Sequence, residues 1–314
     1  MTLKKIAKLA NVSVSTVSRA LNDSYDIADE TKTYILEIAA KSGYFQKKKR
    51  TKMDNMSKSS VNIAIICPEI ISQFYSGIAQ ILVKEFKRES SRCIIYNCDF
   101  EHDGINAQLK KCINDPEVHG IICLSDATET DKVDIPFVSF NPTLEHSSIH
   151  TKISNAAEKI TEYFEQQGIK KIAFVGEKNT VGKSDVFFNT LSSRQISCSE
   201  FVSDYRFDKA GRQGAEHLLK NGLPQAVICA YDEIALGLIS TLEENGIKVP
   251  DDVRVVGIND IPAAKYCFGG LSTISYDFKN VCPQIAKDML EDIRTGKTVK
   301  RKYTVKTDLI IRNT

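Results

Sequence analysis

Apolar residues near the start of the chain recur every three or four positions. The segments 3–10 and 14–21 follow this spacing, which predicts two short amphipathic helices separated by a break at 11–12. Ser13 can cap the second helix, because a serine oxygen accepts hydrogen bonds from the free backbone N–H groups of a first helical turn. The two segments are therefore expected to form a pair of helices joined by a tight turn.

A third helix is predicted between a cap at Asp29 and a stop at Gly43. Its inner face is expected to hold Tyr34, Ile35, Ile38 and Ala39. Three short helices with a tight turn between the first two are the layout of a helix-turn-helix domain. We therefore expect residues 1–45 to form a DNA-binding headpiece.

From residue 61 onward the pattern changes to short apolar runs that alternate with amphipathic segments. Such runs are typical of buried parallel strands joined by crossover helices. The predicted strands are 61–67, 93–98, 118–124 and 135–140 in a first set, and 170–176, 225–231 and 252–258 in a second. The fold class is therefore α/β, with the headpiece followed by two doubly wound parallel-sheet subdomains over 61–314. The crevice between two such halves is a common place for a small ligand.

Charge is distributed unevenly along the chain. Residues 1–60 contain 12 lysine or arginine residues against 6 acidic ones, whereas the rest of the chain contains 30 against 34. A basic head on a mildly acidic body predicts that only the head meets a polyanion. Residues 46–60 have no apolar periodicity and begin with a run of lysines, so we interpret them as a basic linker or hinge.

The composition disfavours several classes of protein. The chain of 314 residues has no apolar run long enough to span a bilayer and no export signal, so we expect a cytoplasmic protein. The nine cysteines form no CxxC pair and the five histidines are isolated, which disfavours disulfides, a metal site and nucleophilic catalysis. No complete phosphate-binding glycine loop is present, and we expect no cofactor.

The stretch LKKIAKLANVSVSTVSRALND (3–23) resembles the N-terminal signature of the lactose/galactose repressor (LacI/GalR) family of bacterial transcription regulators. The resemblance continues in ETKTYILEIAAKSGY (30–44), QQGIKKIAFVG (166–176) and YDEIALGLISTLEENGIKVPDDVRVVGINDIP (231–262). It implies a periplasmic-binding-protein-like effector core and a homodimer on a pseudo-palindromic operator. It also implies a repressor of a carbohydrate-utilisation operon, controlled by a small molecule between the lobes.

The resemblance assigns roles to individual residues of the second helix. The residues that would face bases are Val14, Ser15, Thr16 and Arg19, and those that would bond phosphates are Ser13, Ser18 and Asn22. These side chains suit a major groove, because serine and threonine are short and arginine has a fork that can bond a guanine in a bidentate manner.

The linker departs from the family pattern. Tyr44 matches the residue that ends the family's headpiece, and Met53 falls at the position of a leucine that wedges into the DNA minor groove. Methionine is a known type of minor-groove wedge. Whether a hinge helix forms stays open, since FQKKKRTKMDNMSKSS (45–60) lacks the usual alanines.

The resemblance also places an effector site between the lobes. The residues carried over are Phe74, Tyr75, Asn141, Lys183, Tyr231, Asp232 and Asn259. Lys183 stands where the sugar-binding members have an arginine, and Asn141 and Asn259 stand where they have aspartates. We therefore expect a crevice with fewer acceptor carboxylates than is usual in the family.

Three hypotheses for the effector stay open. A crevice with few carboxylates and a lysine would suit an anion, such as a sugar phosphate or a sugar acid. Amides and aromatic rings would instead suit a neutral carbohydrate, and a ligand-independent repressor would keep only a vestigial pocket. The alternative from another class is a cytosolic carbohydrate-acting enzyme on the same bilobal scaffold. We expect a regulator and not an enzyme, because no catalytic pattern has supporting context.

Overall fold

A computed structural model gives the fold. It describes residues 2–21, 27–42, 44, 61–100, 102–125, 127, 133–140, 148–151 and 153–314. The predicted linker over 46–60, with Met53, lies outside the described residues, as do Asn22, Gly43 and Asn141.

Three helices form the headpiece, as the apolar spacing predicts. They are α1 (Leu3–Ala10), α2 (Val14–Leu21) and α3 (Asp29–Lys41). Asn11 ends α1 in the left-handed region, with φ 53° and ψ 43°, which asparagine tolerates better than most residues. Ser13 caps α2 as expected, because the N–H of Thr16 donates to Ser13 Oγ at 3.0 Å.

A small apolar core joins the three helices. It contains Ile6, Ala7, Ala10, Val17, Ala20, Ile35 and Ala39. The prediction for α3 is wrong in two details, since Ala28 rather than Asp29 is the N-cap residue and Tyr34 is 54% exposed. Neighbouring residues on a helix point about 100° apart, so Tyr34 turns toward solvent while Ile35 enters the core.

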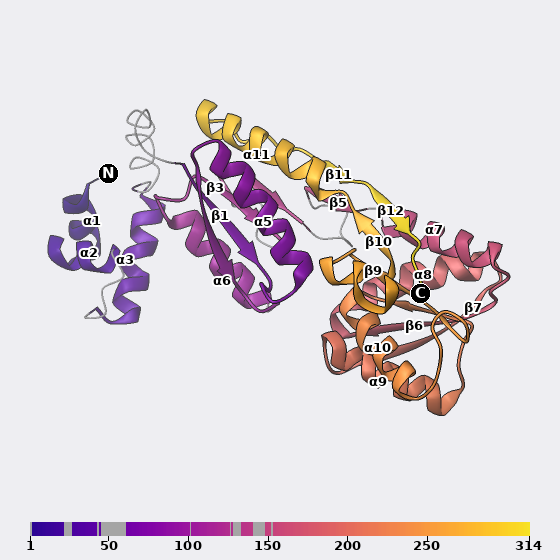
Figure 1. The fold of residues 1–314 in the computed structure, drawn as a ribbon. Coiled ribbons are helices and arrows are strands. Elements are labelled where there is room, and N and C mark those ends of the chain that lie inside the picture. Colours follow the sequence, from indigo (N-terminus) through magenta and orange to yellow (C-terminus); the bar gives the residue numbers. More distant parts are fainter. Residues whose placement is uncertain are drawn as a thin grey trace.

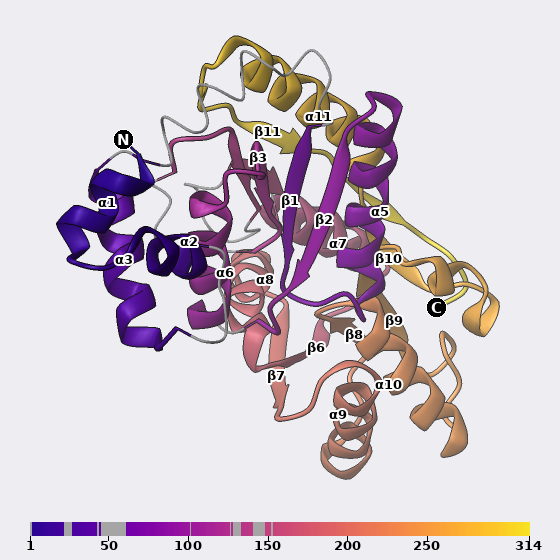
Figure 2. The ribbon, with the colours of Figure 1, turned by 90° about the vertical axis from the view of Figure 1, so that its left-hand side faces the viewer.

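The N-terminal lobe is built on a four-stranded parallel sheet in the order β2-β1-β3-β4. Its strands are β1 (Asn62–Cys67), β2 (Arg92–Asn97), β3 (Gly120–Cys123) and β4 (Phe137–Ser139). One face is covered by α6 (His102–Asn114), and the other by α5 (Gln73–Arg88) and α11 (Phe278–Thr295) (Figure 2). The prediction that β2 is buried is wrong: it is an edge strand with Ile94 and Ile95 exposed, which an apolar run alone does not distinguish from a central strand.

The C-terminal lobe contains a six-stranded sheet in the order β12-β10-β9-β8-β6-β7, parallel except for the pairing of β12 with β10. Its strands are β6 (Lys171–Glu177), β7 (Ser197–Ser203), β8 (Ala226–Cys229), β9 (Arg254–Ile258), β10 (Ser272–Tyr276) and β12 (Thr307–Ile310). The helices of the lobe are α7 (Ile153–Gln166), α8 (Val181–Ser193), α9 (Phe207–Asn221) and α10 (Asp232–Glu244), with short 3₁₀ turns η2 (Lys178–Thr180), η3 (Pro262–Lys265) and η4 (Cys267–Gly269). Strand β7 escaped prediction because its sequence, SCSEFVS, mixes polar and apolar residues at the sheet edge.

The lobes are not continuous halves of the sequence. Helix α11 follows β10 of the C-terminal lobe but packs beside α5 on the N-terminal lobe (Figure 1). The chain then returns through β11 (Tyr303–Val305), which pairs with β5 (Ile149–Thr151), to the edge strand β12. The predicted fold class is confirmed, with the addition that a C-terminal helix completes the first lobe.

Candidate functional site

Helix α2 buries one face and leaves the other to solvent. Val17 and Ala20 lie in the headpiece core, whereas Val14, Ser15 and Arg19 are exposed. Ser15 and Arg19 are four residues apart, so they lie on the same side of the helix. The outward face of α2 therefore presents an apolar group, a hydroxyl and a guanidinium together, and the half-buried Thr16 and Ser18 flank them.

The hydroxyls at the start of α2 form a small cluster. Ser13 Oγ lies 2.7 Å from both Ser15 Oγ and Thr16 Oγ1. A helix N-terminus carries partial positive charge and is a suitable place for a DNA phosphate. Tyr44, which follows α3 in the chain, also packs against the headpiece core. The contact roles assigned to these residues stay predictions.

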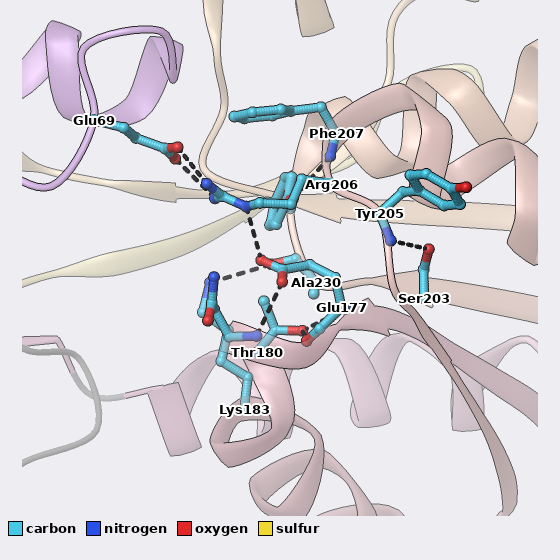
Figure 3. Close-up of polar contacts among 11 residues, drawn as sticks. Glu69, Glu177, Thr180, Lys183, Ser203, Tyr205, Arg206, Phe207 and Ala230 are labelled. Carbon is cyan, nitrogen blue, oxygen red and sulfur yellow. Dashed lines mark hydrogen bonds and ion pairs between the residues drawn. The ribbon is translucent and has the colours of Figure 1, made fainter. Parts of the chain in front are cut away.

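Charged side chains from both lobes meet between the two sheets (Figure 3). Arg206, in the segment after β7, donates from Nη2 to Glu69 Oε1 at 2.8 Å and from Nη1 to Glu69 Oε2, and its Nε lies 3.4 Å from Glu177 Oε1. Glu69 follows β1 of the N-terminal lobe, and Glu177 ends β6 of the C-terminal lobe. Both carboxylates thus lie at the carboxyl ends of parallel strands, where open α/β sheets bind ligands.

Aromatic rings enclose Arg206. Its guanidinium carbon lies 4.8 Å from the ring centroids of both Phe100 and Phe207. The ring of Phe100 contacts Tyr75, with centroids 5.6 Å apart, and the backbone N–H of Phe207 donates to Tyr231 OH at 3.1 Å. Two residues of the predicted effector site, Tyr75 and Tyr231, therefore lie around Arg206.

Lys183 and Glu233 add two ionisable groups to this region. The amine of Lys183 donates to the backbone oxygen of Ala230 at 3.2 Å, and burial lowers the pKa of Lys183 to about 8, although Glu177 and other carboxylates raise it. Burial raises the pKa of Glu233, while hydrogen bonds from its own backbone and from that of Gln73 lower it. Among the described residues, Glu233 Oε2 has no hydrogen-bond partner.

Asp232 is engaged inside the C-terminal lobe. Its Oδ1 accepts from Thr273 Oγ1 at 2.5 Å and its Oδ2 accepts from the N–H of Ile261 at 2.8 Å. Burial raises the pKa of Asp232 to about 7, and the two hydrogen bonds oppose that shift. Its two oxygens therefore tie the start of α10 to Thr273 in β10 and to Ile261 in the segment after β9, which is a structural role beside its predicted role in effector binding.

Phe74 and Asn259 are the remaining described residues of the predicted effector site. The ring of Phe74 belongs to an aromatic cluster with centroid separations of 5.2–6.1 Å, formed with Tyr75, Phe140, Tyr276 and Phe278. Asn259 has a positive φ of 115°, and its N–H donates to the backbone oxygen of Ile274 at 2.7 Å. Their contact with an effector stays a prediction.

Several residues of the interlobe site were not predicted from the sequence, namely Glu69, Phe100, Glu177, Arg206, Phe207 and Glu233. Glu69 comes two residues after one apolar run predicted as a strand and Glu177 directly after another, so position at a strand end was a usable signal. Arg206 carried no such signal, because β7 was not predicted. That the site has fewer acceptor carboxylates than is usual in the family stays a prediction. The structure adds Glu69 and Glu177, which both bond Arg206, at positions that the prediction did not include.

The Asp232→Asn substitution is expected to change how stability depends on pH. With its pKa raised to about 7 by burial, Asp232 keeps a proton in the folded state that it loses near its ordinary value of 3.8 when unfolded. Its contribution to stability is therefore present at low pH and is lost as pH rises through the window from about 4 to 7. Urea unfolding at several pH values measures the free energy of unfolding. Over this window that free energy should fall less in Asp232→Asn than in the wild-type chain, whereas the exposed control Asp251→Asn should keep the wild-type slope. An unchanged slope in Asp232→Asn would contradict the assignment.

Comparison with known proteins covers both parts of the chain. Residues 2–46 match the model of bacterial regulatory proteins of the lacI family, and residues 161–314 match a periplasmic binding protein-like domain. The "Probable HTH-type transcriptional repressor ExuR" of Bacillus subtilis (strain 168) is 28% identical over 100% of this chain and 98% of its own length.

Solved structures show the same fold. The lac repressor dimer bound to operator and the anti-inducer ONPF has a TM-score of 0.69 at 20% identity, over 100% of this chain and 98% of that one. A periplasmic binding protein/LacI transcriptional regulator from Alkaliphilus metalliredigens QYMF, complexed with D-xylulofuranose, has a TM-score of 0.70 at 19% identity, over 81% of this chain and 99% of that one.

A helix-turn-helix headpiece on a two-lobed, periplasmic-binding-protein-like core defines a class of DNA-binding transcription regulators. Within that class, the chain belongs to the lactose/galactose repressor family of bacterial transcription regulators. The family expected from the sequence signature is thereby confirmed.

The described part of the chain also bears on metal binding and membrane insertion. Within it, no group of three or more histidine, cysteine or acidic residues is arranged to hold a metal ion. Across the same residues, every helix is too short or too polar to cross a membrane.

Proposed function

We propose that the chain is a cytoplasmic, homodimeric repressor that binds a pseudo-palindromic operator and responds to a small carbohydrate-type effector between its lobes. In this proposal residues 1–45 are the headpiece, 46–60 the hinge and 61–314 the effector-binding and dimerisation core. The chain is not an enzyme in this proposal and uses no cofactor. Membership of a family of transcription regulators supports it.

The proposal for DNA binding rests on the side chains of the outward face of α2. Val17 and Ala20 fix the rotation of α2 in the headpiece, so that Val14, Ser15 and Arg19 project away from it. In a major groove, valine suits a thymine methyl group and arginine suits the two acceptors of guanine. One arginine–guanine pair contributes only about 1–3 kcal/mol of discrimination, so a single headpiece is too weak to select one site in a genome.

A homodimer solves this problem by placing two headpieces on two half-sites. Support for a dimer comes from the N-terminal lobe, where the edge strand β2 exposes Ile94 and Ile95 at 38% and 45%. An uncovered apolar edge strand is characteristic of a surface that pairs with another chain. The lac repressor structure similar to this chain is itself a dimer.

The interlobe site supports an effector. Side chains from both lobes converge on Arg206, so a ligand bound there contacts both and changes how they close. Such a ligand controls DNA binding only through a difference in affinity between the two arrangements of the lobes. The similar regulator from Alkaliphilus metalliredigens was solved with a sugar, D-xylulofuranose.

The decisive experiment is selection of operator DNA by the full-length chain from a random duplex pool. A two-fold symmetric site should be enriched, and the mobility shift on that site should respond to at least one sugar or sugar derivative. Enrichment with no response to any of them would favour a ligand-independent repressor. Failure to enrich a symmetric site would refute the proposal.

A further inference from the structure

Arg206 is positioned by its own lobe. Its Nε lies 3.4 Å from Glu177 Oε1, and its guanidinium stacks on the ring of the next residue, Phe207, at 4.8 Å. Phe207 is held in turn by the hydrogen bond from its N–H to Tyr231 OH at 3.1 Å. All four residues belong to the C-terminal lobe, which therefore holds the guanidinium on its own side of the interface (Figure 3). The N-terminal lobe adds Phe100, whose ring centroid also lies 4.8 Å from the guanidinium carbon.

The edge of the guanidinium that carries Nη1 and Nη2 meets a carboxylate from the other lobe. Both oxygens of Glu69 accept from it, in the parallel two-bond arrangement by which arginine recognises a carboxylate. Glu69 is buried, at 7% exposed, whereas Arg206 is partly exposed, at 30%. The contact between the lobes therefore contains a carboxylate-recognition site that is occupied by the protein's own side chain.

Glu69 is the partner that moves away from Arg206 when the lobes separate. It lies in the segment between the end of β1 at Cys67 and the start of α5 at Gln73, beside the exposed Ile70 and Ile71. Separation of the lobes removes Glu69 from Arg206 but leaves Glu177 in place. Arg206 already bonds two carboxylates, so a third can enter only by exchange with Glu69, because like charges packed together repel.

We propose that Arg206 determines effector specificity by selecting a ligand that carries a carboxylate, and that Glu69 occupies the position of this carboxylate when no effector is bound. This inference rests on the proposed function in one respect, namely that the effector binds between the lobes. The free oxygen of Glu233 and the amine of Lys183 lie in the same region and supply an acceptor and a donor for ligand hydroxyls. The chemical class is thus a polyhydroxylated acid.

The test compares matched ligands on the full-length chain. D-glucuronate, D-glucose and D-glucose 6-phosphate, with the corresponding D-galactose series, are titrated by calorimetry and thermal shift. In the wild-type chain, an acid should bind roughly tenfold or more tightly than its neutral parent, as a charged hydrogen-bond pair predicts. The phosphates should rank below the acids, because the position of Glu69 fits a planar two-oxygen group.

Two substitutions separate the roles of the pair. Glu69→Gln keeps the length of the side chain but removes the competing charge, so affinity for the acid should rise about tenfold and affinity for the neutral parent should stay the same. Arg206→Gln should abolish the preference for acids, and Arg206→Lys should restore only part of it because lysine lacks the fork. The matched control is Arg194→Gln, which removes a surface arginine paired with Glu165 at 2.8 Å and should leave every affinity unchanged.

The outcomes separate this inference from the proposed function. The inference is overturned if acids bind no more tightly than their neutral parents to both the wild-type chain and Glu69→Gln. It is also overturned if no acid binds to either of these two chains. A phosphate that binds more tightly than its matching acid overturns the choice of a carboxylate. Operator selection is measured independently of these titrations. If neutral sugars and acids release the chain from its operator equally well, the inference is wrong and the proposed function still holds.

Discussion

Arg19→Ala is expected to remove most of the operator preference while leaving binding to arbitrary DNA. Arg19 is exposed on the outward face of α2, and its fork is suited to a guanine. An arginine–guanine pair discriminates by about 1–3 kcal/mol, so two half-sites together should lose roughly 2–6 kcal/mol, on the order of 30-fold to 10⁴-fold. The measurement is the ratio of affinities for the selected operator and a scrambled duplex at one salt concentration.

A matched control is available on α3. Lys41 is an exposed basic residue of the headpiece outside α2, with Glu37 Oε2 3.4 Å from its amine. Lys41→Ala should leave the ratio of operator to scrambled affinity unchanged. If Arg19→Ala preserves that ratio within about threefold, less than the 1–3 kcal/mol expected of a base contact, the predicted base-reading role is wrong.

Gly237→Ala is expected to destabilise the C-terminal lobe strongly. Helices α9 and α10 approach each other so closely that a Cβ on Gly237 would lie 2.2 Å from the backbone oxygen of Asp208, and one on Gly211 would lie 2.0 Å from that of Ile234. Backbone atoms cannot move aside as a side-chain end can, so the helices must separate. We expect a loss of about 3 kcal/mol in the free energy of unfolding, measured in urea.

The same substitution should have the opposite effect on α5. Nothing lies within 4 Å of a Cβ built on Gly77, in the middle of that helix. Gly77→Ala should therefore stabilise the chain by roughly 0.5–1 kcal/mol, because alanine loses less backbone entropy than glycine on forming a helix. Equal effects at Gly77 and Gly237 would show that the close crossing of α9 and α10 is not what Gly237 serves.

Much of the fold was predictable because it depends on short-range patterns. The spacing of apolar residues and the cap at Ser13 placed α1 and α2 correctly, and the seven apolar runs from residue 61 onward all became strands. The errors came where the pattern is ambiguous. Tyr34 could be assigned to either face of α3, and the apolar run of β2 carried no mark of an edge strand.

The candidate site was predictable only in part. Tyr75, Lys183 and Tyr231 were found through the family resemblance, and the structure brings them near Arg206. Asp232 was placed in the same site, but both of its oxygens bond Thr273 and Ile261 inside the lobe. A resemblance transfers positions along the chain, whereas the partners of a side chain depend on its neighbours in space.

The amino-acid sequence by itself determined most of the elements, the outward face of α2 and the division into two sheets, because periodicity and capping act over a few residues. Only the tertiary structure decided that α11 completes the first lobe and that Arg206 meets Glu69, which is 137 positions away. Contacts of this kind join residues that are far apart in the sequence, and no local pattern encodes their geometry. Which charged side chains meet between the lobes was therefore decided by packing.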